Sequence, residues 1–170
     1  TPSKVDKAEL QGEQVGLLQL DGTNLTPELV PSIETEMHLR IYRYCPDIVA
    51  VVHAHPMTAA TFAASEQDID THLVCESYAV VGEPVRVPYH CMGTEALAES
   101  VAEAAARAPA VMMQNHGVLT TGQTLLEAAN RLEVLEASAR QTVIAQVVGR
   151  MQPLDSEKLR ALDVLVGRAE

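Results

Sequence analysis

The sequence is poor in aromatic and basic residues. It has no Trp, one Phe and four Tyr among 170 residues, so its core must be built mainly from Val, Leu, Ala and Met. Only 12 Lys and Arg stand against 23 Asp and Glu. The resulting net charge of −11 argues against a nucleic-acid partner, because phosphate-backbone binding needs a basic surface. A small anionic substrate is still compatible with this charge, since it responds to the local field.

Cysteines and long apolar runs are also scarce. Cys45, Cys75 and Cys91 are scattered and form no Cys-x-x-Cys pair, a pattern typical of incidental thiols in a reducing compartment. No run of about 18 apolar residues and no signal peptide is present, so we expect a cytoplasmic protein with no membrane partner. The chain length predicts a single domain over residues 1–170.

Strand and helix patterns alternate along the chain and predict an α/β fold. Short connections near residues 82 and 117 favour antiparallel neighbours, and helices packed on both faces give a three-layer α/β/α sandwich with a mixed, mostly antiparallel central sheet. We expect strands at 15–20, 48–52, 78–81, 84–88, 110–114 and 118–121. We expect a loop at 66–76 and helices at 31–45, 57–64, 94–107, 124–148 and 156–166, with Ser32 and Thr94 as caps.

Three histidines carry most of the chemical information. His53 and His55 follow the apolar run 48–52, and His116 follows the run 110–113. Positions i and i+2 of a strand share a face, so His53 and His55 would point the same way. Three imidazoles at strand ends, with a carboxylate nearby, form the ligand set of a catalytic zinc site with an open position.

A metal site is not the only interpretation of this pattern. A lone His-x-His on an apolar strand is weak support, because two core histidines bonded to backbone carbonyls would look the same. The coincidence with His116 favours the metal. Gly117 follows it directly and would let the backbone approach a ligand closely.

The chain resembles the zinc-dependent class II aldolase/adducin family, and most closely its L-fuculose-phosphate aldolases. The resemblance covers nearly the whole chain, although the family's N-terminal Gly-Asn-x-Ser block is missing. The matching motifs are Thr1-Pro2-Ser3, Pro31-Ser32-Ile33-Glu34 with His38, Tyr42, Pro46-Asp47, Ala50-Val51-Val52-His53-Ala54-His55-Pro56, Pro88-Tyr89, Gly93-Thr94 and Gln114-Asn115-His116-Gly117.

This resemblance implies roles for individual residues. It implies one Zn²⁺ per subunit, with Glu34 as the general acid/base. Tyr89 matches a tyrosine that a neighbouring subunit contributes as proton donor. The family resemblance also implies a homotetramer with active sites at its subunit interfaces. The ligands of the zinc would be His53, His55 and His116.

The resemblance is less complete around the expected phosphate site. Ser3 and Ser32 match part of the family's phosphate-binding set. Lys4 stands at a glycine position of the family, and Ile33 replaces a second serine. Lys4 would add positive charge if it faces the substrate, so we expect Ser3, Lys4 and Ser32 to bind substrate.

The implied activity is that of a zinc-dependent lyase. It would cleave a ketose phosphate resembling fuculose 1-phosphate into dihydroxyacetone phosphate and an aldehyde by retro-aldol chemistry. The alternative within the family is a decarboxylase of an oxo or hydroxy acid, which also needs a stabilised enolate but no phosphate pocket. Glu rather than Asp at position 34 points away from the family's epimerases, and the intact histidines argue against a non-catalytic scaffold. Imidazole ligands also accept cobalt, nickel or manganese, so the sequence leaves the metal used in the cell open.

Overall fold

The computed structural model describes residues 1–169, apart from the side chain of Lys7. Three short 3-10 helices occur at Lys7–Glu9, Gly12–Gln14 and Thr71–Leu73. The longer elements, in chain order, are α1 (Thr35–Tyr44), β1 (Ala50–Ala54), α2 (Met57–Ala63), α3 (Cys75–Val81), β2 (Val85–Val87), α4 (Glu95–Ala105), β3 (Ala110–Met113), β4 (Gly117–Gly122), α5 (Leu125–Val148) and α6 (Ser156–Leu165).

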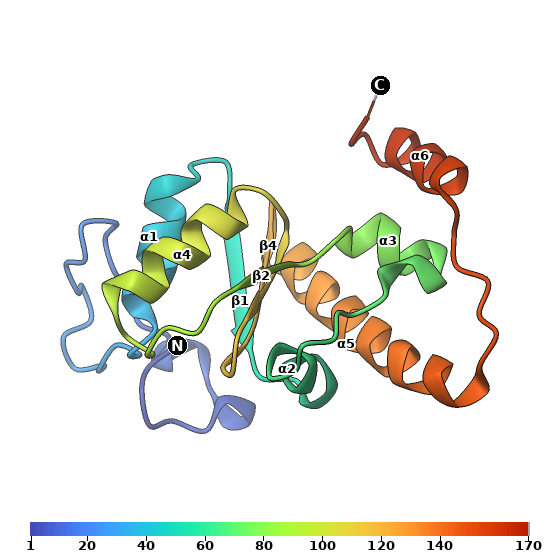
Figure 1. Cartoon of the computed structure of the whole chain (residues 1–170). Helices are drawn as coiled ribbons and strands as arrows, with labels where there is room; N and C mark the ends of the chain where they lie inside the picture. Colours follow the sequence, from blue (N-terminus) through green and yellow to red (C-terminus); the bar gives the residue numbers. More distant parts are fainter. Residues whose placement is uncertain (170) are drawn as a thin grey trace.

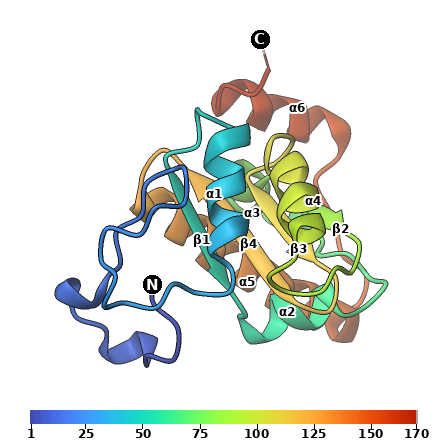
Figure 2. The ribbon, with the colours of Figure 1, turned by 90° about the vertical axis from the view of Figure 1, so that its left-hand side faces the viewer.

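The strands form one sheet in the order β1-β4-β3-β2. β4 pairs antiparallel with both β1 and β3, whereas β2 pairs parallel with β3. Helices α1 and α4 cover one face, and α2 and α5 cover the other (Figures 1 and 2). The predicted three-layer sandwich with a mixed, mostly antiparallel sheet is therefore confirmed.

The sheet separates two apolar cores, because its central strand β3 is buried on both faces. Val111 and Met113 face the core under α1 and α4. Ala110 and Met112 face the core under α2 and α5. As the composition predicts, the residues of both cores are mainly Val, Leu, Ala and Met. The core under α2 and α5 also contains the aromatic residue Phe62.

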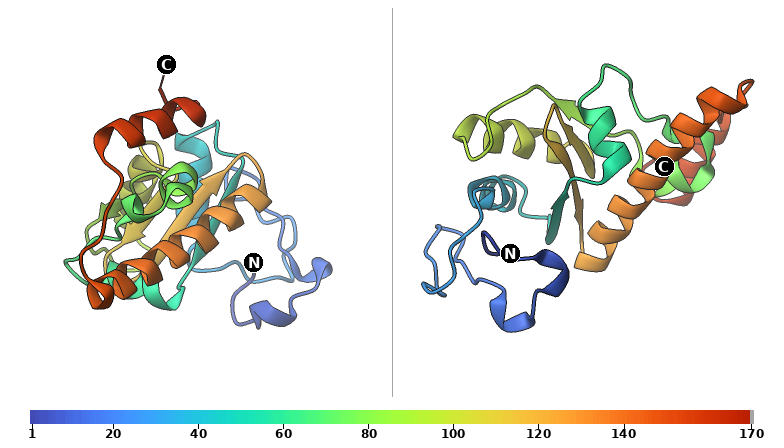
Figure 3. Two further views of the ribbon diagram at one scale, coloured as in Figure 1. Left: turned by 90° about the vertical axis from the view of Figure 1, so that its right-hand side faces the viewer. Right: turned by 90° about the horizontal axis from the view of Figure 1, so that it is seen from below.

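Most of the predicted helices are confirmed to within a few residues. Their caps explain where they begin: Thr94 accepts a hydrogen bond from the N–H of Leu97, and Thr124 accepts one from the N–H of Glu127. Helix α5 crosses the face of the sheet that it covers together with α2 and extends past the edge of the sheet. Helices α3 and α6 lie on the same side (Figure 3). No helix among the described residues has the length and apolarity needed to span a bilayer.

Two predicted strands are wrong. Residues 15–20 form only an isolated bridge, Leu18 to Asn24, around a turn at Asp21-Gly22. No neighbouring strand extends this bridge, and Leu17 and Leu20 are more than half exposed. Residues 78–81 belong to α3, where Ser77 and Val81 are both buried one turn apart. Tertiary packing there overrides the β-propensity of the valines, and the antiparallel pair expected near residue 82 does not form.

Two boundaries differ from the prediction in a way that matters for the histidines. The strand predicted at 48–52 is β1, Ala50–Ala54, so His53 lies within the strand rather than after it. The helix predicted from residue 31 starts at Thr35. Ser32 is not its N-cap, because its hydroxyl accepts a hydrogen bond from the N–H of Glu34, before the helix begins.

Replacing Leu135 by Ala is expected to destabilise the fold by creating a cavity under α5. Leu135 is fully buried, so Leu135→Ala should lower the free energy of unfolding by about 2–5 kcal/mol. Leu126 is on the same helix and 80% exposed, so Leu126→Ala should change the free energy of unfolding by no more than about 0.5 kcal/mol. Urea denaturation followed by circular dichroism measures both. Equal losses would contradict this assignment of the core.

Candidate metal centre

His53 is held in one orientation by the pairing of β1 with β4. In the register of this pair, Ala54 is opposite Val118. The Nδ1 atom of His53 lies 2.9 Å from the carbonyl oxygen of Val118. A carbonyl can only accept, so Nδ1 carries the proton and Nε2 keeps its lone pair. That Nε2 atom is buried and has no hydrogen-bond partner, and burial lowers the pKa of His53 to about 4.

His116 reaches the same place from the turn between β3 and β4. Asn115 adopts a left-handed conformation (φ 55°), which Asn tolerates better than most residues. The N–H of His116 donates to the carbonyl oxygen of Met113 and closes the turn. The buried Nδ1 atom of His116 also has no hydrogen-bond partner, and burial lowers the pKa of this histidine.

Gly117 is required for the turn to lie against the end of β1. A Cβ atom at this position would lie 2.8 Å from the carbonyl oxygen of Ala54 and would collide with the ring of His55. The close approach at Gly117 is therefore to the end of β1 and to His55, whereas its expected approach to a ligand stays a prediction.

The three imidazoles form one cluster. Ring centroids are 4.8 Å apart for His53 and His55, and 5.0 Å apart for His53 and His116. The third pair, His55 and His116, is 5.3 Å apart. One nitrogen from each ring lies within 4.8 Å of the other two, an arrangement that could hold a metal ion. The shared face predicted for His53 and His55 is therefore present.

Glu34 supplies a carboxylate next to this cluster. Its Oε1 lies 3.5 Å from Nε2 of His116, and its Oε2 is buried without a partner. Burial raises the pKa of Glu34, while the nearby His55 lowers it to a smaller extent. A raised pKa favours proton uptake by this carboxyl, as a general acid/base requires.

The unpartnered atoms provide a test of whether a cation fits here. An unpaired buried polar group costs about 1–3 kcal/mol, so three in one place need an explanation. A divalent cation would provide one, because imidazole nitrogens and carboxylate oxygens are its usual ligands. The residues present therefore fit a metal. The three atoms are Nε2 of His53, Nδ1 of His116 and Oε2 of Glu34.

The expected substrate-binding residues are only partly brought together. Pro2 forms an antiparallel bridge with Pro31, so Ser3 lies opposite Val30, and its N–H donates to the carbonyl oxygen of Val30. The hydroxyl of Ser3 donates to the carbonyl oxygen of Pro31. Lys4 is exposed and has a left-handed backbone conformation (φ 60°).

Tyr89 lies on the surface near the turn that carries His116. Its side chain is exposed, and its backbone N–H donates to Oε1 of Gln114 at 3.0 Å. Gly93 fits closely against Ile33, since a Cβ atom on Gly93 would lie 2.6 Å from Cγ1 of Ile33. The segment 89–93 is thus fixed between Ile33, which precedes Glu34, and the β3–β4 turn. Gln114 is part of the sequence motif that contains His116, but nothing in that motif indicates that its side chain binds the backbone of Tyr89.

Comparisons with known proteins agree with this geometry. A family model described as the class II aldolase and adducin N-terminal domain matches residues 1–143. A 3-oxo-tetronate 4-phosphate decarboxylase from Pectobacterium atrosepticum is 33% identical over 145 residues, which cover 82% of this chain and 66% of that protein. The chain therefore spans slightly less than two thirds of the length of that relative.

Aldolases are similar to the chain at a comparable sequence identity. A 5-deoxy-D-ribulose 1-phosphate aldolase from Bacillus thuringiensis serovar kurstaki is 32% identical, over 95% of this chain and 76% of that protein. The solved structure of an L-fuculose 1-phosphate aldolase superposes with a TM-score of 0.86 and 30% identity. That superposition covers 98% of this chain and 78% of the other.

Adding a methyl group at position 117 is expected to disturb the cluster. In Gly117→Ala the new Cβ would collide with His55, so we expect zinc affinity to fall about 10- to 100-fold. Competition with a chromophoric chelator measures this affinity. Gly12 has open space around it, so Gly12→Ala is the control and should bind zinc as the parent does. Equal affinity in all three proteins would argue against a metal on His55.

Acidification is expected to destabilise the metal-free protein between pH 6.5 and about 4. Burial lowers the pKa of both His38 and His53 from 6.5 to about 4. The unfolded chain therefore binds more protons in this window, and the free energy of unfolding falls as the pH falls. Each histidine contributes a slope of about 1.4 kcal/mol per pH unit.

Urea unfolding across this pH range, in the presence of a chelator, measures that slope. His38→Gln removes one of the histidines with a lowered pKa and should reduce the slope by about 1.4 kcal/mol per pH unit. An unchanged slope would mean that His38 does not titrate in this way.

Proposed function

The chain belongs to the class II aldolase and adducin family, and from this we propose that it is a metal-dependent lyase acting on a small phosphorylated sugar. Family membership supports a lyase. The observation that carries the finer proposal is the group of buried, unpartnered atoms on His53, His116 and Glu34. Such a group is costly in a merely structural role, and it is explained by a cation and a proton-transferring carboxylate.

We propose one Zn²⁺ per subunit on the three histidines. A zinc ion held by neutral imidazoles keeps its full charge and acts as a Lewis acid that stabilises negative charge developing on the substrate. The chain's own contribution is to favour the neutral form of two of these imidazoles, since burial lowers the pKa of both His53 and His116. The bond from His53 to Val118 fixes which nitrogen of that ring is free.

Glu34 is the proposed general acid/base. Its carboxylate lies beside His116, its pKa is raised by burial, and one of its oxygens is free of other bonds. It would exchange a proton with the carbon atom at which the substrate is cleaved. Its position immediately before α1 fixes the carboxylate at the start of a helix.

Tyr89 is the proposed second proton donor, acting in the active site of a neighbouring copy. Its exposure supports this, because a residue that serves another subunit must lie on the surface of its own. The bond from its backbone to Gln114 fixes its distance from the histidine turn. On this basis we propose a homotetramer with its active sites at the interfaces between subunits.

The proposed reaction is retro-aldol cleavage of a ketose phosphate. The names of the aldolase relatives and of the decarboxylase relatives all specify a phosphorylated substrate, which supports phosphate as part of the substrate here. Ser3, Lys4 and Ser32 are the proposed phosphate contacts. Decarboxylation of a 3-oxo acid phosphate is the second candidate, because the decarboxylase relative matches at an identity similar to that of the aldolase.

Product analysis separates the two reactions. The zinc-loaded protein is incubated with L-fuculose 1-phosphate, 5-deoxy-D-ribulose 1-phosphate and 3-oxo-tetronate 4-phosphate. We expect dihydroxyacetone phosphate and an aldehyde from one of the first two. Glu34→Gln should lower kcat by about 10²- to 10⁴-fold, because it removes a proton-transfer group.

Several outcomes would contradict the proposal. Release of carbon dioxide from the oxo acid alone would favour the decarboxylase. Full activity in Glu34→Gln would remove Glu34 from the mechanism. Activity that survives in His116→Ala with unchanged metal content would refute the three-histidine site.

A further inference from the structure

Helix α2 links the two chain segments that carry the histidines. It begins at Met57, directly after His55 and Pro56. At its other end, the carbonyl oxygen of Ala63 accepts a hydrogen bond from the N–H of Asn115, the residue before His116. The position of α2 therefore influences where His55 lies relative to His116.

The first turn of α2 is capped from a different helix. Its N-cap residue is Pro56, whose side chain forms no hydrogen bond, so the free N–H groups of the first turn need another acceptor. Glu136 of α5 provides it. Its carboxylate accepts from the N–H of Thr58 (3.1 Å), from the hydroxyl of Thr58 (2.8 Å) and from the N–H of Ala59 (2.8 Å).

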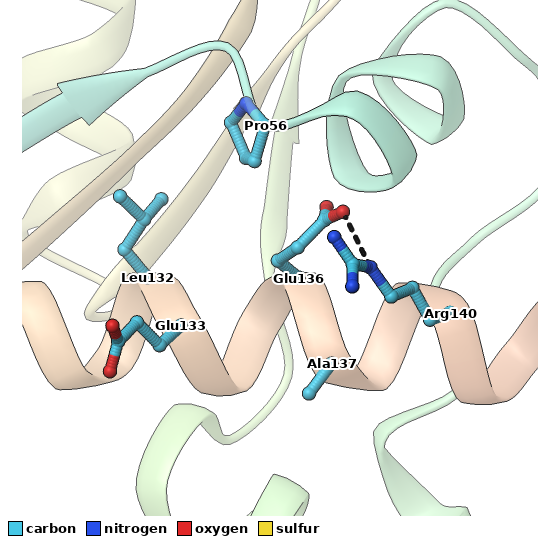
Figure 4. A pocket seen from close by; sticks show the side chains of 6 residues that line it. All are labelled: Pro56, Leu132, Glu133, Glu136, Ala137 and Arg140. Atoms are coloured by element: carbon cyan, nitrogen blue, oxygen red, sulfur yellow. Dashed lines mark hydrogen bonds and ion pairs between the residues drawn. The ribbon is translucent and has the colours of Figure 1, made fainter.

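Glu136 points from α5 toward the connection between β1 and α2 (Figure 4). Its side chain is 13% exposed and forms an ion pair with Arg140 at 3.0 Å. Burial would raise the pKa of Glu136, but the hydrogen bonds from Ala59, Thr58 and Arg140 hold it below the usual value. The carboxylate is therefore ionised at neutral pH, and charged acceptors form the stronger hydrogen bonds.

Glu136 also lines a surface pocket of about 350 Å³, together with Pro56, Leu132, Glu133, Ala137 and Arg140 (Figure 4). Both oxygens of its carboxylate bond to α2. These bonds assign Glu136 to holding α2 rather than to receiving a ligand in the pocket.

The C-terminal end of α2 is held by a side chain of opposite charge. Arg86 of β2 donates to the carbonyl oxygens of Phe62 (3.1 Å), Ala63 (3.3 Å) and Ser65 (3.0 Å). An anion at the N-terminus and a cation at the C-terminus both complement the helix dipole. A helix of only seven residues is marginal by itself, so these outside contacts determine its position.

We propose that Glu136 is a positioning residue of the metal centre, which acts by fixing the start of α2 and, through it, His55. This inference rests on the proposed function, because it assumes that the three histidines bind a metal. Glu136 lies in α5, outside the motifs of the histidine segments, and its hydrogen bonds and ion pair within the described part of the chain go to Thr58, Ala59 and Arg140.

The test uses Co²⁺, whose visible absorption reports the geometry of its ligands. The full chain is titrated with Co²⁺ in the parent protein, in Glu136→Ala and in Glu136→Gln, and zinc affinity is measured by chelator competition. Glu133→Ala is the matched control, since Glu133 is an exposed residue of the same helix and lines the same pocket. Urea unfolding of each metal-free protein is measured in parallel.

We expect Glu136→Ala to lower zinc affinity about 10- to 100-fold and to change the Co²⁺ spectrum, as loss of an outer-shell support does. Glu136→Gln keeps one acceptor oxygen and should recover part of both properties. Glu133→Ala should match the parent in both. If Glu136→Ala does not fold, the Glu136→Gln variant decides, because it retains the shape of the side chain.

The outcomes distinguish this inference from the proposed function. A parent protein that binds neither Co²⁺ nor Zn²⁺ overturns both. A parent that binds them, with Glu136 variants of equal affinity and unchanged spectrum, overturns the positioning role alone. The positioning role is overturned even if these variants unfold at lower urea concentrations, because loss of stability without a change at the metal is a purely structural effect.

Discussion

The antiparallel pairing of β1 with β4 is the contact on which both the fold and the metal centre depend. It places Ala54 opposite Val118, so that the ring of His53 meets the carbonyl oxygen of Val118. His116 lies in the turn between β3 and β4, directly before β4. The pairing of β4 with β1 therefore also brings His116 to the end of β1. A slip of one residue would turn His53 and His55 to the other face of the sheet. Burial of both faces under helices fixes the register against such a slip.

The chemistry of the site depends on the burial of several of its groups. Burial lowers the pKa values of His53 and His116, raises that of Glu34, and also leaves polar atoms without partners. Folding therefore tolerates a local cost here that the two apolar cores offset elsewhere. The low dielectric around the buried groups strengthens electrostatic interactions formed among them.

The sequence predicts some of this arrangement and not the rest, for physical reasons. The shared face of His53 and His55 follows from strand geometry alone, and the caps of α4 and α5 follow from Thr94 and Thr124. By contrast, Tyr78 to Val81 have strand-forming residue types but form a helix, because packing decides such short segments. Local patterns also do not specify which elements lie side by side, and so could not place β2 parallel to β3.

Glu136 shows the same limit at the level of one residue. In the sequence it resembles Glu133, three positions earlier on the same helix, since both are acidic residues in a long amphipathic segment. Only the folded structure shows that one lies against α2 and the other at the surface. A residue that acts through a neighbouring element carries no local signal of that role.

The position of His116 late in the sequence determines when, during synthesis and folding, the three histidines can come together. His53 and His55 leave the ribosome together, but the third imidazole follows only after α2, α3, β2, α4 and β3 have been synthesised. The hairpin must then fold back onto β1, which is a long-range contact and therefore slow to form. Until that happens a nascent chain offers a metal only two histidines of the set. A cation held by all three histidines would therefore bind only after β4 has paired with β1.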